Sequence, residues 1–125
     1  MTSTIVIADD DRDIRELVRI SLTRAGFEVV ADVDDGNAAL AAILALAPDV
    51  AILDVAMPGL TGLEVCRLVR EQLTLAHVNI LLLSAAADDA SRSAGLTAGA
   101  TDYLTKPFSP RELVARLATM SSEEQ

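Results

Sequence analysis

Aromatic residues and cysteine are scarce in this chain. Of its 125 residues, one is Tyr, two are Phe and none is Trp, and Cys66 is the only cysteine. A lone cysteine excludes a disulfide within the chain, which favours a reducing, intracellular compartment. Hydrophobic residues still make up 51% of the sequence, so we expect one packed core built mainly from Val, Ile, Leu and Ala.

Long apolar stretches and positive charge are also missing. No apolar run approaches the roughly 20 residues that a transmembrane helix needs, and the first residues lack the basic and apolar segments of a signal peptide. These absences predict a cytoplasmic protein that does not enter a membrane. Ten Lys and Arg stand against 19 Asp and Glu, a net charge of −9. Such a surface disfavours direct nucleic-acid binding and repels phosphorylated ligands unless a metal cation intervenes.

Short apolar segments alternate with segments of helical periodicity five times along the chain. This alternation is typical of an α/β fold, a doubly wound five-stranded parallel sheet with helices on both faces. Residues 1–120 are predicted to form this domain, and 121–125 a polar tail or the start of a linker. We expect strands at 5–8, 28–33, 50–53, 80–83 and 103–104, and helices near 14–25, 37–47, 63–73, 88–98 and 110–120.

Two helices carry clear signals in the sequence. Asp11 is predicted to cap the first helix, and Ser109, directly before a proline, the last. In the first and third helices, apolar residues recur at helical spacing and are expected to face the core. These are Ile14, Leu17, Val18, Leu22 and Ala25, then Leu63, Cys66, Val69 and Leu73.

Polar residues follow four of the predicted strands. Asp9 and Asp10 come after the first strand, Asp54 after the third, Ser84 after the fourth and Lys106 after the fifth. In doubly wound sheets, functional groups collect beyond the carboxyl ends of the strands. We therefore expect these side chains to form one site.

Three carboxylates in one place need a compensating charge. At an effective dielectric of about 20, two unit charges about 4 Å apart repel by about 4 kcal/mol. Lys106 offsets one charge of Asp9, Asp10 and Asp54, and a divalent cation would balance the other two. Oxygen ligands favour Mg²⁺. Asp9 and Asp10 alone are equally compatible with helix capping, but Asp54 after an all-apolar strand is poorly explained by solvation.

Four segments resemble the motifs of response-regulator receiver domains, and the resemblance extends over essentially the whole chain. It implies the flavodoxin-like strand order 2-1-3-4-5. It also implies a two-component phosphoacceptor switch, which assists its own phosphorylation and dephosphorylation without being a conventional enzyme. The segments are VIADDD at 6–11, LDVAMPG at 53–59, LSA at 83–85 and GATDYLTKPF at 99–108.

The resemblance implies a role for each residue at the strand ends. Asp54 would accept a phosphoryl group from a sensor histidine kinase or a phosphotransfer protein. Asp10, Asp54 and the backbone carbonyl of Ala56 would bind Mg²⁺ directly, and Asp9 mainly through a bound water. Lys106 would contact a phosphoryl oxygen as a point charge.

The switch and the output are likewise implied by the resemblance. Ser84 would donate its hydroxyl to the phosphoryl group, and Tyr103 would then turn inward, reshaping the face of the fourth helix, fifth strand and last helix. This face would act on an effector domain or an output protein. The peptide between Lys106 and Pro107 resembles the family's cis peptide. Phosphorylation-dependent homodimerisation stays open, because the family's charged set is only partly matched by Arg92, Asp102, Glu112 and Arg116.

Other interpretations remain at this point. A flavin-binding module would carry a Gly- and hydroxyl-rich loop after the first strand, and a haloacid-dehalogenase-type phosphatase would carry Asp at the position of Ala56. A receiver-fold scaffold that is never phosphorylated is the main alternative function. Ser84 could cap a helix, Lys106 could be a surface residue and Tyr103 a fixed aromatic of an edge strand. His77, the only histidine, is expected at the surface, away from the site.

Overall fold

Five parallel strands form one sheet at the centre of the computed structural model, which describes residues 2–123. The strand order is β2-β1-β3-β4-β5, which confirms the predicted fold class and order. Each strand is short and contains one of the apolar segments predicted from the sequence. The strands are β1 (Thr4–Ala8), β2 (Glu28–Val33), β3 (Val50–Asp54), β4 (Asn79–Ser84) and β5 (Asp102–Thr105).

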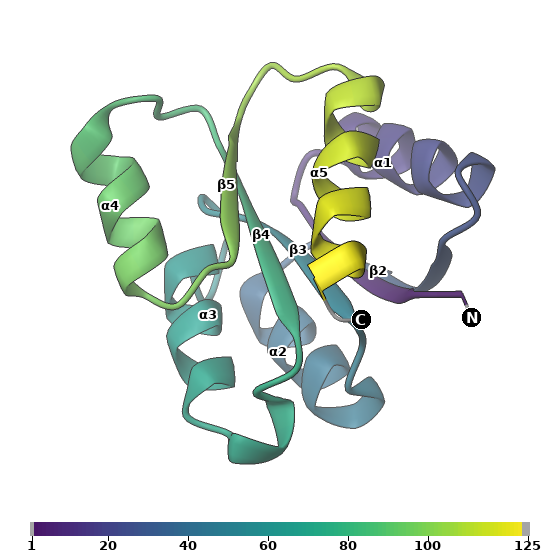
Figure 1. Cartoon of the computed structure of the whole chain (residues 1–125). Helices are drawn as coiled ribbons and strands as arrows, with labels where there is room; N and C mark the ends of the chain where they lie inside the picture. The colour runs from purple at the N-terminus through teal and green to yellow at the C-terminus, as the bar shows by residue number, and fades with distance from the viewer. Residues whose placement is uncertain (1, 124–125) are drawn as a thin grey trace.

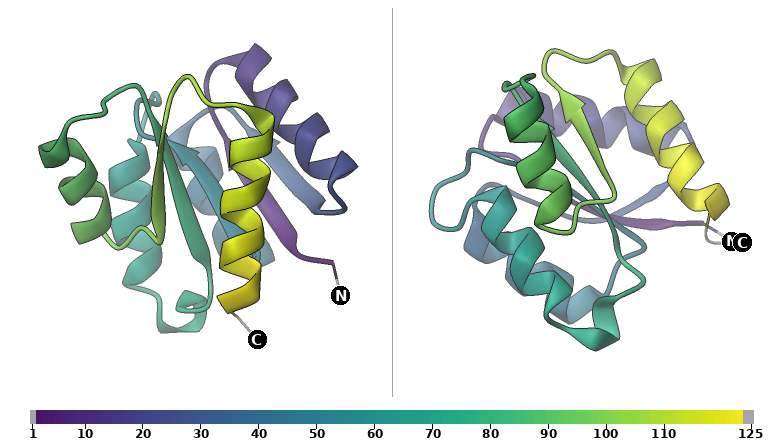
Figure 2. Two further views of the ribbon diagram at one scale, coloured as in Figure 1. Left: turned by 45° about the horizontal axis from the view of Figure 1, so that its top comes forward. Right: turned by 60° about the vertical axis from the view of Figure 1, so that its left-hand side comes forward.

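Helices cover both faces of this sheet. α1 and α5 lie on one face, and α2, α3 and α4 lie on the other (Figures 1 and 2). Because successive side chains of a strand point to opposite faces, Ile5 and Ile7 pack toward α1 and α5, whereas Val6 and Ala8 pack toward α2 and α3. The helices are α1 (Arg12–Arg24), α2 (Gly36–Leu46), α3 (Gly62–Arg70), α4 (Asp89–Thr97) and α5 (Pro110–Glu123), with a 3₁₀ turn, η1, at Leu73–Leu75.

The predicted helix caps are confirmed. Asp11 Oδ1 accepts hydrogen bonds from the backbone N–H groups of Asp13 and Ile14, at 3.0 and 3.2 Å. Ser109 Oγ accepts one from the N–H of Glu112 at 3.0 Å. Each cap fixes where a helix starts beside the carboxyl edge of the sheet, and so helps to place the loops that carry the polar residues.

Three predicted core residues are wrong. Ala25, the residue that follows the last turn of α1, is exposed. Leu17 is 44% exposed, because α1 buries only the narrow stripe of Val18 and Leu22 against the sheet. Leu73 is 90% exposed. The cause is that α3 ends at Arg70, so the helical spacing that placed Leu73 beside Val69 no longer applies in the 3₁₀ turn that follows.

The last helix is longer than expected. α5 continues to Glu123, so its backbone runs into the segment 121–125 that was predicted as a polar tail, and residues 124–125 of that prediction lie outside the described residues. None of the helices described combines the length and apolar character needed to cross a membrane.

Candidate functional site

The predicted acidic residues come together at the carboxyl edge of the two central strands. β1 and β3 are hydrogen-bonded neighbours, so the turn after β1 and the end of β3 meet. One carboxylate oxygen from each of Asp9, Asp10 and Asp54 lies within 4.8 Å of the other two. Asp9 and Asp54 are buried, whereas Asp10 is exposed. Asp10, Asp54 and Lys106 border an open pocket of about 610 Å³.

Asp54 ends a strand that is buried throughout, and only 5% of the residue is exposed. Burial, reinforced by the negative charge of Asp9, raises the pKa of Asp54 from 3.8 to about 6, although Lys106 and the N–H of Ala56 act in the opposite direction. Charging this carboxyl therefore costs free energy. A group with such a cost is more simply explained by chemistry than by solvation.

Lys106, the only lysine of the chain, pairs with both buried carboxylates. Its Nζ lies 3.0 Å from Asp9 Oδ2 and 3.3 Å from Asp54 Oδ1. Burial alone would lower the pKa of Lys106, but the two acidic partners outweigh it and raise that pKa above its ordinary value. The Lys106 side chain is only 18% exposed and contacts two buried carboxylates, which excludes its interpretation as a solvated surface residue. The peptide bond between Lys106 and Pro107, in the loop between β5 and α5, is cis, as predicted.

The donor set fits a hard divalent cation. Three carboxylates face one ammonium, so the site keeps an excess of negative charge. The buried Asp9 Oδ2 has its ion pair with Lys106 but no directed hydrogen bond. Asp10 is exposed at the mouth of the pocket, where a metal would retain water ligands, as Mg²⁺ does. Oxygen donors, excess charge and access by water together suit Mg²⁺.

The predicted switch residues lie next to this pocket. Ser84 is 7% exposed, and its hydroxyl accepts a hydrogen bond from the N–H of Ala86 at 3.1 Å. Tyr103 is already buried, at 2% exposure, and its hydroxyl donates to the carbonyl of Ala86 at 2.7 Å. Tyr103 already points inward in this structure, so the predicted inward turn is not needed to bury its ring. Both side chains meet at the same loop residue between β4 and α4.

Two further sequence expectations concern residues away from the pocket. Cys66 is fully buried, its thiol donates to the carbonyl of Ala98 at 3.4 Å, and burial raises its pKa, so its assignment to the core is confirmed. His77 is exposed in the turn before β4, where its Nε2 lies 3.4 Å from the carbonyl of Ala47. Neither residue belongs to the acidic site.

Sequence reasoning missed the residues that support this site from behind. A side chain at Gly62 would overlap the carbonyl oxygen of Asp54, and one at Gly36 would overlap that of Leu60. Arg15 donates to the carbonyl of Asp9 at 2.8 Å. The glycines near the acceptor motif are visible in the sequence, but close backbone approach is a tertiary property that no local pattern reveals.

Comparison with known proteins identifies relatives along almost the whole chain. A family model described as "Response regulator receiver domain" matches residues 5–118. The transcriptional regulatory protein GltR of Pseudomonas aeruginosa is 43% identical over 122 residues, which are 98% of this chain and 50% of GltR. The phosphate regulon transcriptional regulatory protein PhoB of the same organism is 44% identical over 115 residues, 91% of this chain and 49% of PhoB. This chain thus spans about half the length of these curated relatives.

The structural comparison agrees with the sequence comparison. The chemotaxis response regulator CheY4 of Vibrio cholerae superposes with a TM-score of 0.90 at 35% identity, covering 96% of this chain and 99% of that one. Together with the acidic pocket, these matches set aside the flavin-binding and phosphatase interpretations. The chain belongs to the family of response regulator receiver domains of two-component signalling.

Proposed function

We propose that Asp54 accepts a phosphoryl group from a sensor histidine kinase or a phosphotransfer protein, in a reaction that requires Mg²⁺. The observation that carries this proposal is the placement of Asp54. It is a buried carboxylate at the end of a central strand, 3.3 Å from the only lysine of the chain and open to a pocket on one side. A scaffold that is never phosphorylated would gain nothing from a carboxyl that is so costly to ionise.

The proposed step is a displacement at phosphorus. An Oδ of deprotonated Asp54 attacks the phosphorus of a phosphohistidine, the new O–P bond forms as the N–P bond breaks, and the leaving imidazole nitrogen keeps the electron pair and takes up a proton. With a pKa of about 6, Asp54 is largely ionised at neutral pH. Lys106 stabilises charge on the phosphoryl oxygens, which is where catalysis of phosphoryl transfer mainly lies.

The proposed metal ligands are those that the resemblance to receiver domains implies. Asp10, Asp54 and the backbone carbonyl of Ala56 would hold Mg²⁺ directly, and Asp9 would act through a water molecule. When bound, the ion supplies two positive charges that reduce repulsion between the carboxylates and the incoming phosphoryl group. The carboxylates would orient the ion, and without it their negative charge would repel anionic ligands from the pocket.

The proposed output is a change of the face made by α4, β5 and α5. The Ser84 hydroxyl accepts a hydrogen bond from the N–H of Ala86, whose carbonyl holds Tyr103, so a shift of Ser84 toward a phosphoryl group on Asp54 would pull on the residue that contacts Tyr103. A movement of this loop would therefore shift the hydrogen-bond acceptor of Tyr103 and alter the surface near its ring. The altered face would act on an effector domain or an output protein, and the net charge of −9 favours a protein target over nucleic acid.

Homodimerisation through this face is a further part of the proposal. Arg116 pairs with Asp102 at 2.8 Å and with Glu112 at 3.9 Å, and Arg92 lies over the Tyr103 ring. These contacts are within one chain and partly exposed, and such pairs contribute only about 0–1 kcal/mol each. We expect light scattering to show a mass increase with beryllofluoride and Mg²⁺; an unchanged mass at the tested concentration would rule out the dimer there.

Intact-protein mass spectrometry tests the proposed function. Wild-type protein treated with acetyl phosphate and Mg²⁺ should gain the mass of one phosphoryl group, and chelation of the metal should abolish the gain. Asp54→Asn should gain nothing, whereas Asp49→Asn, which alters a carboxyl at the opposite end of β3, should behave as wild type. No adduct on the wild type, with intact folding, would favour the scaffold alternative.

A further inference from the structure

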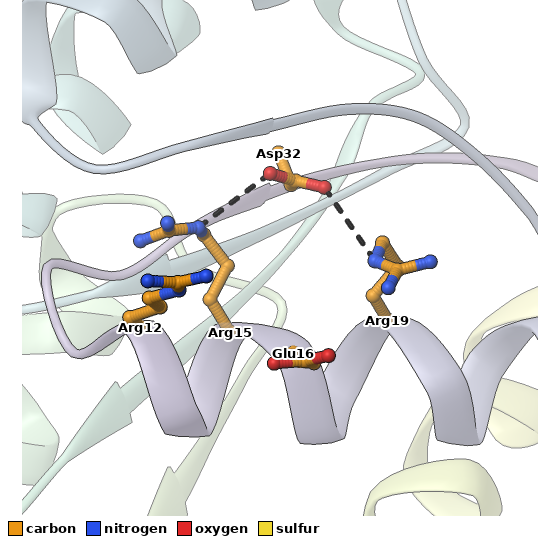
Figure 3. A pocket seen from close by; sticks show the side chains of 5 residues that line it. All are labelled: Arg12, Arg15, Glu16, Arg19 and Asp32. Atoms are coloured by element: carbon orange, nitrogen blue, oxygen red, sulfur yellow. Dashed lines mark ion pairs between the residues drawn. The ribbon is translucent and has the colours of Figure 1, made fainter.

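Arg15 links the acidic turn to the neighbouring strand β2. Its Nη1 donates a hydrogen bond to the backbone carbonyl of Asp9 at 2.8 Å, and its Nε lies 3.5 Å from Asp32 Oδ1. Only 19% of the Arg15 side chain is exposed. Figure 3 shows Arg15 and Arg19 reaching from α1 to the two oxygens of Asp32, with the Arg15 guanidinium held between the helix and the strand.

Asp9 is held at each of its polar groups. Its N–H donates to the carbonyl of Val33 at 3.1 Å, its Oδ1 accepts from the N–H of Asp11 at 2.9 Å, and its Oδ2 pairs with Lys106. The carbonyl is held by Arg15 alone among these partners. This carbonyl belongs to the peptide unit that joins Asp9 to Asp10, so its orientation sets the direction in which the backbone enters Asp10.

We propose that Arg15 is a positioning residue for the carboxylates of Asp9 and Asp10, acting through the Asp9–Asp10 peptide and braced by Asp32. This inference rests on the proposed Mg²⁺-dependent function. Arg15 does not border the pocket, so it acts on the metal ligands from behind. Partners of this kind orient the groups that bind a metal, and their loss typically weakens metal binding by about 10- to 100-fold.

Positioning and simple electrostatics predict opposite results. Arg15 is a positive charge near a site for a cation, so its removal would tighten Mg²⁺ binding if only its charge mattered. If Arg15 orients the ligands, its removal weakens binding. Substitution of Arg12 or Arg19 by Ala provides a matched control, because each change removes one positive charge from the same helix. Neither arginine has a hydrogen bond to Asp9 among the contacts of the described residues.

Calorimetric titration of metal-free protein with Mg²⁺ tests this inference. Arg15→Ala should bind Mg²⁺ about tenfold more weakly than wild type, whereas Arg12→Ala and Arg19→Ala should bind equally well or slightly more tightly. Asp32→Ala should weaken binding in the wild-type background and have no further effect in Arg15→Ala. Binding by Arg15→Ala that is as tight as that of Arg19→Ala would overturn the proposal.

A second measurement separates this inference from the proposed function. Asp11 N–H donates to Asp9 Oδ1, so its hydrogen exchange, followed by NMR without metal, should be faster in Arg15→Ala and unchanged in Arg19→Ala. If wild-type protein bound no Mg²⁺, the proposed function would fail and the exchange rates alone would decide the role of Arg15; equal rates in the two variants would overturn it. If Arg15→Ala did not fold, Arg15→Lys would be compared with Arg19→Lys, because lysine lacks the planar fork of N–H groups through which Arg15 contacts both Asp9 and Asp32.

Discussion

The acidic edge of the sheet and helix α4 differ in how firmly they are held. Asp9 and Asp54 are almost completely buried, between strands whose residues are buried nearly throughout. In α4, by contrast, only Gly95 is buried among nine residues. Regions with few buried apolar contacts open at lower free-energy cost than core strands. The contrast indicates that the chemical groups lie on a rigid element, whereas α4, one part of the proposed output surface, is more flexible.

α4 is held mainly at its C-terminal end. The Cys66 thiol donates to the carbonyl of Ala98, and Arg70 Nε donates to that of Gly99 at 2.8 Å. At the other end, the cap is local, since Asp88 accepts from the N–H of Ser91 at 3.0 Å. Because α3 fixes one end, a movement of the loop after β4 would displace the N-terminal turn of α4 more than its last turn.

Loss of the lysine should have the largest effect on the rigid region. Lys106→Ala removes the cation that contacts both buried carboxylates, so we expect phosphorylation by acetyl phosphate to slow by about 100-fold, as for loss of one stabilising donor. The rate is measured by intact mass over time. Arg111→Ala, which removes an exposed positive charge, serves as control, and an equal loss in both variants would contradict a local role of Lys106.

Glycine substitutions compare the two regions directly. At Gly62 an added methyl meets the backbone of Asp54, which cannot move away, so Gly62→Ala should lower the free energy of unfolding by about 3 kcal/mol. At Gly95 the methyl meets side-chain atoms of Leu82 and Tyr103 at 3.0 Å, and the helix gains about 1 kcal/mol in propensity. Gly95→Ala should therefore change stability by less than about 1 kcal/mol in urea unfolding. Equal losses would refute the contrast.

Asp54→Asn should stabilise the metal-free protein. The folded pKa of Asp54, about 6, exceeds the reference value of 3.8, so between these values the folded state binds more protons than the unfolded state. Stability from this group therefore falls as pH rises from about 4 to 6 and stays low above that range. At about 1.4 kcal/mol per pKa unit, the Asn variant should be about 1–3 kcal/mol more stable at pH 7 and similar to wild type near pH 4.

Denaturant unfolding with a chelator measures this difference at each pH. Addition of Mg²⁺ should stabilise the wild type and narrow its gap to Asp54→Asn at neutral pH, because the metal binds the ionised carboxyl. If the difference in stability between wild type and Asp54→Asn were the same at pH 4 and pH 7, ionisation of Asp54 would not be the source of the cost.

The smallest effect is expected on the pliable side. The Arg92 guanidinium lies 5.2 Å from the centroid of the Tyr103 ring, and its Nη1 donates to the Tyr103 carbonyl at 3.3 Å. Arg92→Ala should lower the free energy of unfolding by about 0.5–1 kcal/mol, because it removes this cation–π contact. Because Tyr103 is the only tyrosine and Trp is absent, tyrosine fluorescence reports this site alone. Its response to beryllofluoride should change in Arg92→Ala and persist in Arg111→Ala; identical responses would exclude coupling of Arg92 to the ring.

The sequence predicted the strand framework well because its signals are local. The apolar segments can be recognised within a few residues of sequence, and the strand order came from the resemblance to receiver domains. The caps at Asp11 and Ser109 were visible because capping depends on residues within one turn. The capping box of Thr61 and Glu64 in α3 has the same local character, and the spacing of these two residues could have revealed it.

Tertiary features were the ones that the sequence could not reveal. The exposure of Leu17 depends on the width of the α1 stripe that the sheet covers, and that of Leu73 on where α3 ends. The bridge from Arg15 to Asp9 and Asp32 joins a helix, a turn and a strand. Such contacts depend on how helices, turns and strands pack together, so the spacing of apolar residues along the sequence does not predict them.

Localisation of the phosphoryl group tests the central claim most directly. Borohydride reduces an aspartyl phosphate to the alcohol, so peptide mass spectrometry after treatment with acetyl phosphate, Mg²⁺ and borohydride reads out the modified residue. We predict homoserine at position 54, and none when Mg²⁺ is chelated before the phosphodonor is added. Reduction at another carboxyl, or at none in a protein that binds Mg²⁺, would contradict the account.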